Sequence, residues 1–253
     1  MKIVVFLNQK GGVGKTTLAF HYIHYLRNKK QRVLAVDLDP QGNLTHSLWR
    51  RDETFPESAH AGLLFEKLNP RPLQVNGIHL IGSDIHLARH ETNTRLENFF
   101  RLKNFLKHVK GYDTVVVDTP PSLGLFTANA IVAAHHLFTP LDTSRYALLG
   151  LKDLQETLRM VSEVAGGPSD FTGVVLLKVK SRTLVGRELE TVLEEEFQDR
   201  YLGSIPESVI FSEATFRGIP VWKLAPVTHT AVLSFLKVLK RMARATEEVI
   251  HAA

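Results

Sequence analysis

A glycine-rich segment between a short apolar run and an amphipathic run restricts the fold more than any other feature of the chain. Residues 2–7 are almost all apolar, residues 8–17 read NQKGGVGKTT, and residues 15–28 follow a helical pattern. Glycines at positions 11, 12 and 14 let successive backbone N–H groups turn towards one anion, and the start of a helix adds partial positive charge. This order of strand, loop and helix predicts a phosphate-binding loop within an α/β sheet.

The rest of the chain alternates short apolar runs with longer amphipathic segments, which is typical of a parallel sheet built from βαβ units. Because the runs are nearly all apolar, helices should cover both faces of this twisted, mostly parallel sheet. We expect strands at residues 2–7, 32–37, 78–81, 114–118, 136–140 and 172–177. We expect helices at residues 15–28, 95–109, 123–134, 150–164, 186–197 and 228–249.

The domain organisation follows from length and local composition. The chain has 253 residues, so residues 1–253 fit one α/β domain with a single P-loop fold. Residues 51–77 are rich in proline, charge and turn residues, with only 61–68 helical in pattern, and we interpret them as a variable surface excursion. Residues 228–250 form the C-terminal helical segment.

Composition excludes several classes of protein. No run approaches the roughly 18 apolar residues of a membrane span, and no signal-peptide cleavage pattern is present, so we expect a cytoplasmic protein. The absence of cysteine excludes disulfides, a thiol nucleophile and zinc–thiolate sites. Lys and Arg outnumber Asp and Glu by 31 to 26, which favours an anionic partner but leaves nucleotide, nucleic acid and membrane surface open.

Two residues of the glycine-rich loop carry the chemistry of phosphate binding. Lys15 is placed to reach the β and γ phosphates of a nucleotide, and the Thr16 hydroxyl to complete the shell of a Mg²⁺ ion. A plain strand-to-helix turn is the alternative, but the order of strand, loop, Lys-Thr and helix argues against it. The usual GxxxxGK[ST] pattern has glycine where this chain has Gln9, and a second lysine, Lys10, follows it.

Carboxylates follow two other apolar runs. Asp37 and Asp39 come at the end of residues 32–37, and Asp118 ends residues 114–118. A lone aspartate at a strand end is more often a turn or cap residue. Three such carboxylates in a chain with a phosphate loop favour a nucleotide–metal site, where Asp118 would hold Mg²⁺ directly or through water.

Lys10 and the segments DLDPQGN at residues 37–43 and DTPPSLG at residues 118–124 resemble the ParA/MinD ATPases, which carry a deviant Walker A loop. The resemblance is to their Soj-like partition branch and extends over nearly the whole chain. Further matches are SRT at residues 181–183, SEA at residues 212–214 and GIPV at residues 218–221.

The resemblance implies an ATP-dependent homodimer with slow, partner-stimulated ATP hydrolysis. It implies ATP and Mg²⁺ as cofactors, with Lys10 reaching the phosphates of the partner subunit and Asp39 positioning the attacking water. The implied catalytic residues are Lys10, Lys15 and Asp39, and the implied metal site is Thr16, Asp39 and Asp118. The implied nucleotide-binding residues are Lys10, Gly11, Gly12, Val13, Gly14, Lys15, Thr16 and Thr17, with Pro206 and Ser208 near the adenine.

DNA contacts are less regular than the nucleotide motifs. Of the DNA-binding residues that the resemblance suggests, Arg182 matches, but Ile210 stands where an arginine is expected. The last helix carries a basic stripe, which a solvated helix face would also explain and which non-specific DNA contact would use. This stripe consists of Lys237, Lys240, Arg241 and Arg244. The acidic pair Glu247 and Glu248 and the few bulky apolar anchors near them argue against membrane attachment.

Three functions remain in competition. The leading one is a nucleoid-associated ParA-type ATPase that segregates or positions a DNA cargo with a ParB-like partner. The second is a related ATPase that positions a protein cargo, such as a carboxysome, a chemosensory cluster or a division factor, through a cargo adaptor. The third is a metabolic P-loop enzyme that uses ATP to activate a small carboxylate.

Overall fold

The computed structural model describes residues 1–50, 53–144, 146–180 and 184–248. These residues form one sheet of eight strands in the order β3-β4-β2-β5-β1-β6-β7-β8, with only β3 antiparallel to its neighbour. The strands are β1 (Lys2–Phe6), β2 (Val33–Asp37), β3 (Leu73–Val75), β4 (Ile78–Ile81), β5 (Thr114–Asp118), β6 (His136–Leu141), β7 (Gly173–Val179) and β8 (Tyr201–Pro206). The predicted α/β class with a mostly parallel sheet is therefore confirmed.

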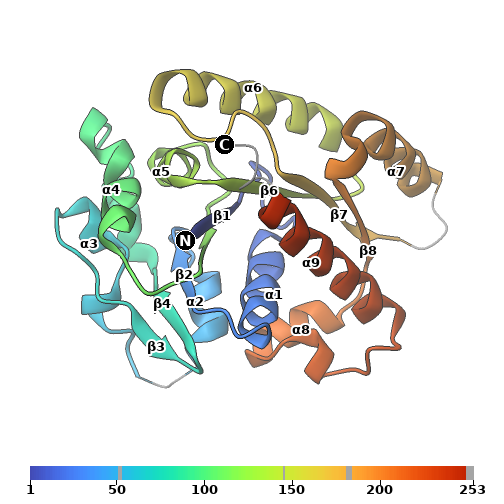
Figure 1. The fold of residues 1–253 in the computed structure, drawn as a ribbon, viewed down its shortest axis with the longest axis horizontal. Helices are drawn as coiled ribbons and strands as arrows, with labels where there is room; N and C mark the ends of the chain where they lie inside the picture. Colours follow the sequence, from blue (N-terminus) through green and yellow to red (C-terminus); the bar gives the residue numbers. More distant parts are fainter. Residues whose placement is uncertain (51–52, 145, 181–183, 249–253) are drawn as a thin grey trace.

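Helices cover both faces of this sheet (Figure 1). One face packs against α1 (Lys15–Asn28), α2 (Asn43–Leu48), α8 (Ile210–Arg217) and α9 (Thr230–Glu248). The other packs against α3 (Gly62–Phe65), α4 (Arg101–His108), α5 (Leu125–Ala133), α6 (Ala147–Ala165) and α7 (Leu184–Phe197). Short 3₁₀ turns lie at Glu57–Ala59, Ile85–His90, Leu96–Phe100, Gln198–Arg200 and Val221–Lys223.

The apolar strands are buried on both sides because alternate side chains point to opposite faces. In β1, Val4 and Phe6 contact the α1 layer, whereas Ile3 and Val5 contact the α5 layer. This explains why the strands read as continuous apolar runs and not as an alternation of apolar and polar residues.

The order of the strands fixes where a site can form. The chain leaves β1, crosses by α1 to β2 on one side, and later returns to place β6 on the other side of β1. In an open parallel sheet such a reversal leaves a crevice at the carboxyl ends of the strands. The loop after β1 and the carboxyl ends of β2 and β5 therefore lie at one edge.

Four elements have no counterpart among the predicted strands and helices, namely α2, α8, β3 and β8. Strand β8 reads YLGSIP, and its glycine and serine interrupt the apolar pattern that marks the inner strands. The predicted helix at residues 95–109 begins as a 3₁₀ turn and becomes α-helical only at Arg101.

The segment at residues 51–77 is only partly a surface excursion. Residues 51 and 52 lie outside the described residues, but Ala61, Leu64 and Phe65 are buried in the core beneath α4 and α5. The helix expected at residues 61–68 shrinks to Gly62–Phe65 because Lys67 adopts a left-handed backbone with φ of 63°.

Across the described ranges of the chain, none of the helices combines the length and apolar character that crossing a membrane requires.

Candidate nucleotide-binding site

The glycine-rich loop joins β1 to α1 as predicted, and its backbone requires glycine. Gly12 and Gly14 have φ of 72° and 104°, a region that side-chain-bearing residues rarely enter. Gly14 also precedes the first residue of α1, and the Leu18 N–H donates to its carbonyl at 2.9 Å. A Cβ on Gly14 would lie 2.6 Å from Leu177 Cδ1, so a larger residue would also have to displace this side chain of β7.

Lys15 is buried, with 6% of its surface exposed, at the first position of α1. Its Nζ donates to the carbonyl of Asn8 at 3.1 Å and to that of Lys10 at 3.4 Å. Burial lowers the pKa of the ammonium. The negative charges of Asp118 and Asp39 partly offset this effect of burial. The loop carbonyls and these two carboxylates thus hold the amine inside the loop, where an incoming phosphate would meet it.

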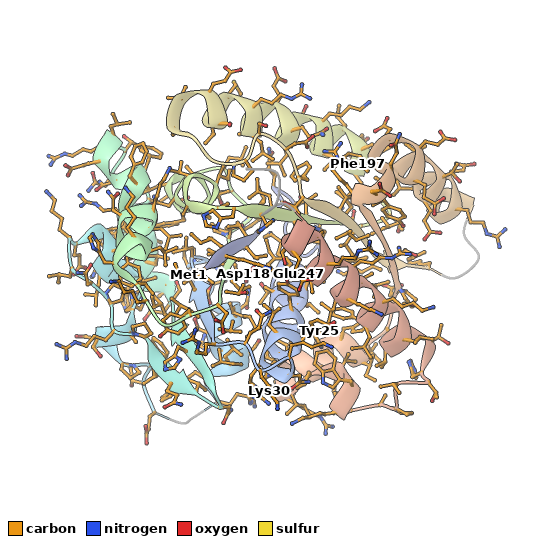
Figure 2. The ribbon with its side chains drawn as sticks, viewed as in Figure 1. Met1, Tyr25, Lys30, Asp118, Phe197 and Glu247 are labelled. Carbon is orange, nitrogen blue, oxygen red and sulfur yellow. The ribbon has the colours of Figure 1, made fainter. Side chains whose placement is uncertain are left out.

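Asp118 and Thr16 meet at the end of β5 and provide the oxygens that a magnesium ion requires. Asp118 is fully buried, its Oδ2 accepts from the Thr16 hydroxyl at 2.6 Å, and its Oδ1 has no hydrogen-bond partner among the described residues. Burial, and next the charge of Asp37, raise the pKa of Asp118 well above its usual range. Figure 2 labels this side chain in the middle of the molecule, among the strands.

An orphaned buried carboxylate oxygen beside a hydroxyl fits a bound Mg²⁺. The described residues hold no cluster of three or more His or acidic side chains able to bind a metal without other ligands. Mg²⁺ beside a nucleotide needs no such cluster, because phosphate oxygens and waters supply most of its ligands. Thr16 and Asp118 would hold the ion, which would supply charge compensation for the phosphates.

Asp37 and Asp39 occupy different environments although the sequence groups them. Asp37 is fully buried and accepts from the Thr45 N–H at 2.8 Å, the Thr45 hydroxyl at 2.7 Å and the Asp39 N–H at 3.0 Å. Burial raises the pKa of Asp37 to about 6. Asp37 therefore fixes the start of α2. Asp39 instead accepts from the Gln41 N–H at 2.9 Å and lines a cleft over the loop.

A cleft of about 910 Å³ opens over the loop. At one end are Gly11, Gly12, Gly14, Lys15, Thr16, Thr17 and Asp39. At the other end are Pro206 and Ser208, which the resemblance places near the adenine. The structure thus brings together most of the predicted nucleotide-binding residues. Lys10, the buried Val13 and Asp118 do not line the cleft, and Asp118 reaches it only through Thr16.

Comparison with known proteins gives the same assignment. The family model of an AAA domain matches residues 1–166. The chromosome-partitioning ATPase Soj of Thermus thermophilus is 34% identical over 236 residues, covering 90% of each chain. The chain belongs to the ParA/MinD family of P-loop ATPases.

Two solved structures extend the comparison. The apo form of Cyanothece McdA has a TM-score of 0.85 at 25% identity, covering 96% of this chain and 99% of that one. Cobyrinic acid a,c-diamide synthase of Mycobacterium smegmatis, with an ATP analogue and magnesium bound, has a TM-score of 0.73 at 30% identity, covering 86% and 91%. This ParA-type protein is accordingly an ATPase with ATP and Mg²⁺ as its cofactors.

The signature lysine of this ParA-type ATPase does not line its own cleft. Lys10 Nζ donates to Asp142 Oδ2 at 2.6 Å, and the lysine side chain is 51% exposed. This ion pair helps to lower the pKa of Asp142, against the effect of burial. Asp142 directly follows β6, at the same edge of the sheet as the loop.

Several residues of the site were not predicted from the sequence. Asp142 and Lys178 both lie at the carboxyl ends of strands, and His46 and Arg50 line the cleft from α2 and its flank. Gln41 also lines the cleft and belongs to the segment at residues 37–43 that carries the resemblance. Asp142 and Lys178 could have been found by applying to β6 and β7 the strand-end argument that identified Asp118. The α2 residues gave no signal, since that helix was not predicted.

All four residues of the basic stripe on α9 of this ParA-type protein are exposed, and Arg241 also donates to the carbonyl of Leu202 on β8 at 3.1 Å. Arg241 and Arg244 line a second cleft, between α9 and α7, together with Glu190 and Glu194. Arg182 lies outside the described residues.

Proposed function

We propose that this ParA-type ATPase is a nucleotide-dependent dimer switch that segregates DNA. The observation that carries the proposal is the position of Lys10. This lysine belongs to the phosphate loop in sequence, yet it lies outside the cleft and pairs with Asp142. A lysine that serves its own nucleotide would lie in the cleft, so this position supports the proposal that Lys10 serves a nucleotide bound to a second subunit.

The surface around Lys10 supports an interface there. Tyr146 and Leu149, at the start of α6 and shortly after Asp142, are 71% and 60% exposed. Exposed aromatic and aliphatic side chains beside a charged pair are characteristic of surfaces that bind another protein. On dimerisation, Lys10 exchanges Asp142 for the phosphates of the partner subunit, and the gain in charge compensation stabilises the dimer.

Each remaining residue has a role that its position allows. Lys15 and the loop N–H groups bind phosphate, and Thr16 and Asp118 hold Mg²⁺. Asp39, 6% exposed at the wall of the cleft, orients water for attack on the γ-phosphate. Hydrolysis removes the anion that Lys10 binds, so the dimer separates.

The DNA, the partner and the location belong to the same proposal. The ATP-bound dimer binds nucleoid DNA without sequence preference, and a ParB-like protein on the cargo stimulates hydrolysis. Lys237 and Lys240 supply phosphate contacts from the exposed side of α9. The protein is then a cytoplasmic, nucleoid-associated partition ATPase.

Light scattering of the protein with MgATP and with MgADP tests the switch. We expect a dimer with ATP and a monomer with ADP, and we expect Lys10→Ala to remain monomeric with ATP while binding it. Asp39→Ala should accumulate the dimer, because water attack is slowed and nucleotide binding is intact. A wild-type protein that stays monomeric at saturating ATP would remove the switch.

One observation favours a protein cargo as the second candidate. Ile210, where the family's DNA contact leads us to expect arginine, is half-buried against the apolar core, so this position offers no cation to DNA. If the ATP dimer fails to bind DNA at low salt, the protein-cargo reading takes the lead.

A further inference from the structure

Lys178 occupies a strained position at the end of β7, beside the phosphate loop. Its φ is 57°, which places a residue with a side chain in the left-handed region. The pairing of β7 with β8 is irregular here, because two β7 residues lie between Leu176 and Val179 whereas one β8 residue lies between their partners. Such bulges redirect side chains at functional edges of sheets, and strained backbone concentrates at functional sites.

The bulge directs the Lys178 side chain onto the loop. Its Nζ donates to the carbonyl of Gly12 at 2.6 Å, and the residue lines the nucleotide cleft. The neighbouring backbone is tied to the adenine end of the same cleft, because the Glu207 N–H donates to the Val179 carbonyl at 3.0 Å. Lys178 therefore joins β7 to the phosphate loop within the cleft, although no motif includes it.

The contact with Gly12 determines the direction of one loop N–H. A trans peptide is planar, and its C=O and N–H point in opposite directions. An amine that holds the Gly12 carbonyl consequently fixes the plane of the peptide that joins Gly12 to Val13. The Val13 N–H then points to the side of the loop opposite Lys178. Gly12, with φ of 72° and open space around its Cβ position, has little else to hold this plane.

We propose that Lys178 is a positioning residue that holds the Val13 N–H in place for the β-phosphate of the nucleotide. The inference rests on the assignment of residues 10–17 as the nucleotide site, but not on dimerisation or DNA binding. Lys15 and Lys178 have different roles: Lys15 supplies charge within the loop, and Lys178 holds the Gly12 carbonyl from the β7 side of the cleft.

Another lysine in the same backbone conformation provides a matched control. Lys30 has φ of 62°, is exposed, and follows the far end of α1, roughly 20 Å of helix away from the loop. Figure 2 labels it at the periphery, below α1. Replacing either lysine by methionine keeps the length of the side chain and removes the amine.

The experiment measures the affinity of the monomeric protein for ADP, ATP and AMP in wild type, Lys178→Met, Lys178→Arg and Lys30→Met. We expect Lys178→Met to lose about tenfold in affinity for both ADP and ATP, the size of effect of a hydrogen bond to a charged group. AMP affinity should not change, because AMP lacks the β-phosphate. Lys178→Arg should recover most of the loss, and Lys30→Met should match wild type.

A second readout follows the loop without nucleotide. In Lys178→Met the amide resonance of Val13 should shift, whereas amides near the far end of α1 should not. Unchanged ADP affinity in a folded Lys178→Met would overturn the proposal, and so would a loss confined to ATP or one shared by AMP. If wild type binds nucleotide but Lys15→Ala binds it equally well, the site itself is misassigned, an outcome that differs from all of these.

Discussion

The carboxyl edge of the sheet and the outer side of α9 both carry residues suited to binding anions, but the two sets of residues differ in their contacts with the rest of the protein. At the edge, the Thr16 hydroxyl donates to Asp118 at 2.6 Å, and Lys15 donates to the carbonyls of Asn8 and Lys10 at 3.1 and 3.4 Å. On α9, four basic residues at helical spacing are all exposed, and two of them, Arg241 and Arg244, also line the cleft beside α7, where Arg241 donates to a carbonyl of β8.

The difference lies in what builds each region. The phosphate loop is made of consecutive backbone groups whose geometry follows from glycines and from the start of a helix, so the sequence determines it almost directly. A basic face is made of side chains, and whether these point to DNA or to a neighbouring strand depends on packing. Arg241 shows this, because its guanidinium caps a carbonyl on the edge strand β8.

The largest expected effect concerns Lys15, at the carboxyl edge of the sheet. Lys15→Ala removes the buried ammonium next to Asp118 and the phosphates, and we expect ATP hydrolysis to fall by about a hundredfold or more. Hydrolysis at saturating MgATP measures it, with Lys107→Ala on the exposed side of α4 as the control. Wild-type turnover in Lys15→Ala would show that the edge is not the site.

A smaller effect is expected for Asp118, the carboxylate at this edge that would hold Mg²⁺. Asp118→Asn keeps the shape but removes the charge, so we expect the Mg²⁺ concentration for half-maximal hydrolysis to rise about tenfold or more. ADP binding without Mg²⁺ should be little changed. Asp113→Asn, a surface carboxylate paired with Arg32, is the control. An unchanged Mg²⁺ requirement would exclude Asp118 from the metal site.

The same distinction explains how much could be predicted. The inner strands and α1 were predicted within a residue or two because buried strands read as apolar runs. Lys15 and Thr16 followed from the phosphate-loop motif, and Asp118 followed from its position at a strand end. Strand β8, α8 and α2 were missed because their patterns are short or interrupted. The Lys10–Asp142 pair, the Asp37–Thr45 contacts and Lys178 depend on tertiary placement, which local patterns do not encode.

The next prediction concerns the basic stripe on α9 and distinguishes its two lysines from Arg241. Charge reversal at Lys237 and Lys240 should weaken DNA binding of the ATP-bound dimer about tenfold at low salt and flatten its salt dependence, because fewer counterions are released. Arg241→Gln should change DNA binding less and lower the melting temperature more, since its guanidinium caps β8. Equal losses in both variants would mean that Arg241 contributes to DNA binding as much as the two lysines do.

The smallest expected effect concerns the pH dependence of folding stability, which a buried histidine in the middle of α1 should cause. His21 is fully buried against Phe235 and Phe211, its Nδ1 is 2.7 Å from the carbonyl of Thr17, and its Nε2 has no partner among the described residues. Burial lowers the pKa of His21 to about 4, and that of His24 nearby to about 3, from an ordinary value of 6.5.

For a base with a depressed pKa, the unfolded chain takes up protons first as pH falls, so folding stability is present above pH 6.5 and is lost between pH 6.5 and 4. Between pH 7 and 5.5 His21 should account for about 1 kcal/mol of that loss. Asp37, whose pKa is raised to about 6, opposes this loss of stability, because protonation of its buried carboxylate stabilises the folded state as pH falls through 6.

Urea unfolding at pH 7 and pH 5.5 measures the sum of these contributions to the free energy of unfolding. His21→Phe should reduce the acid sensitivity by about 1 kcal/mol whatever its stability at pH 7, and the exposed His229→Gln should not. An unchanged slope in His21→Phe would mean that α1 tolerates a charged imidazole between the loop and α9.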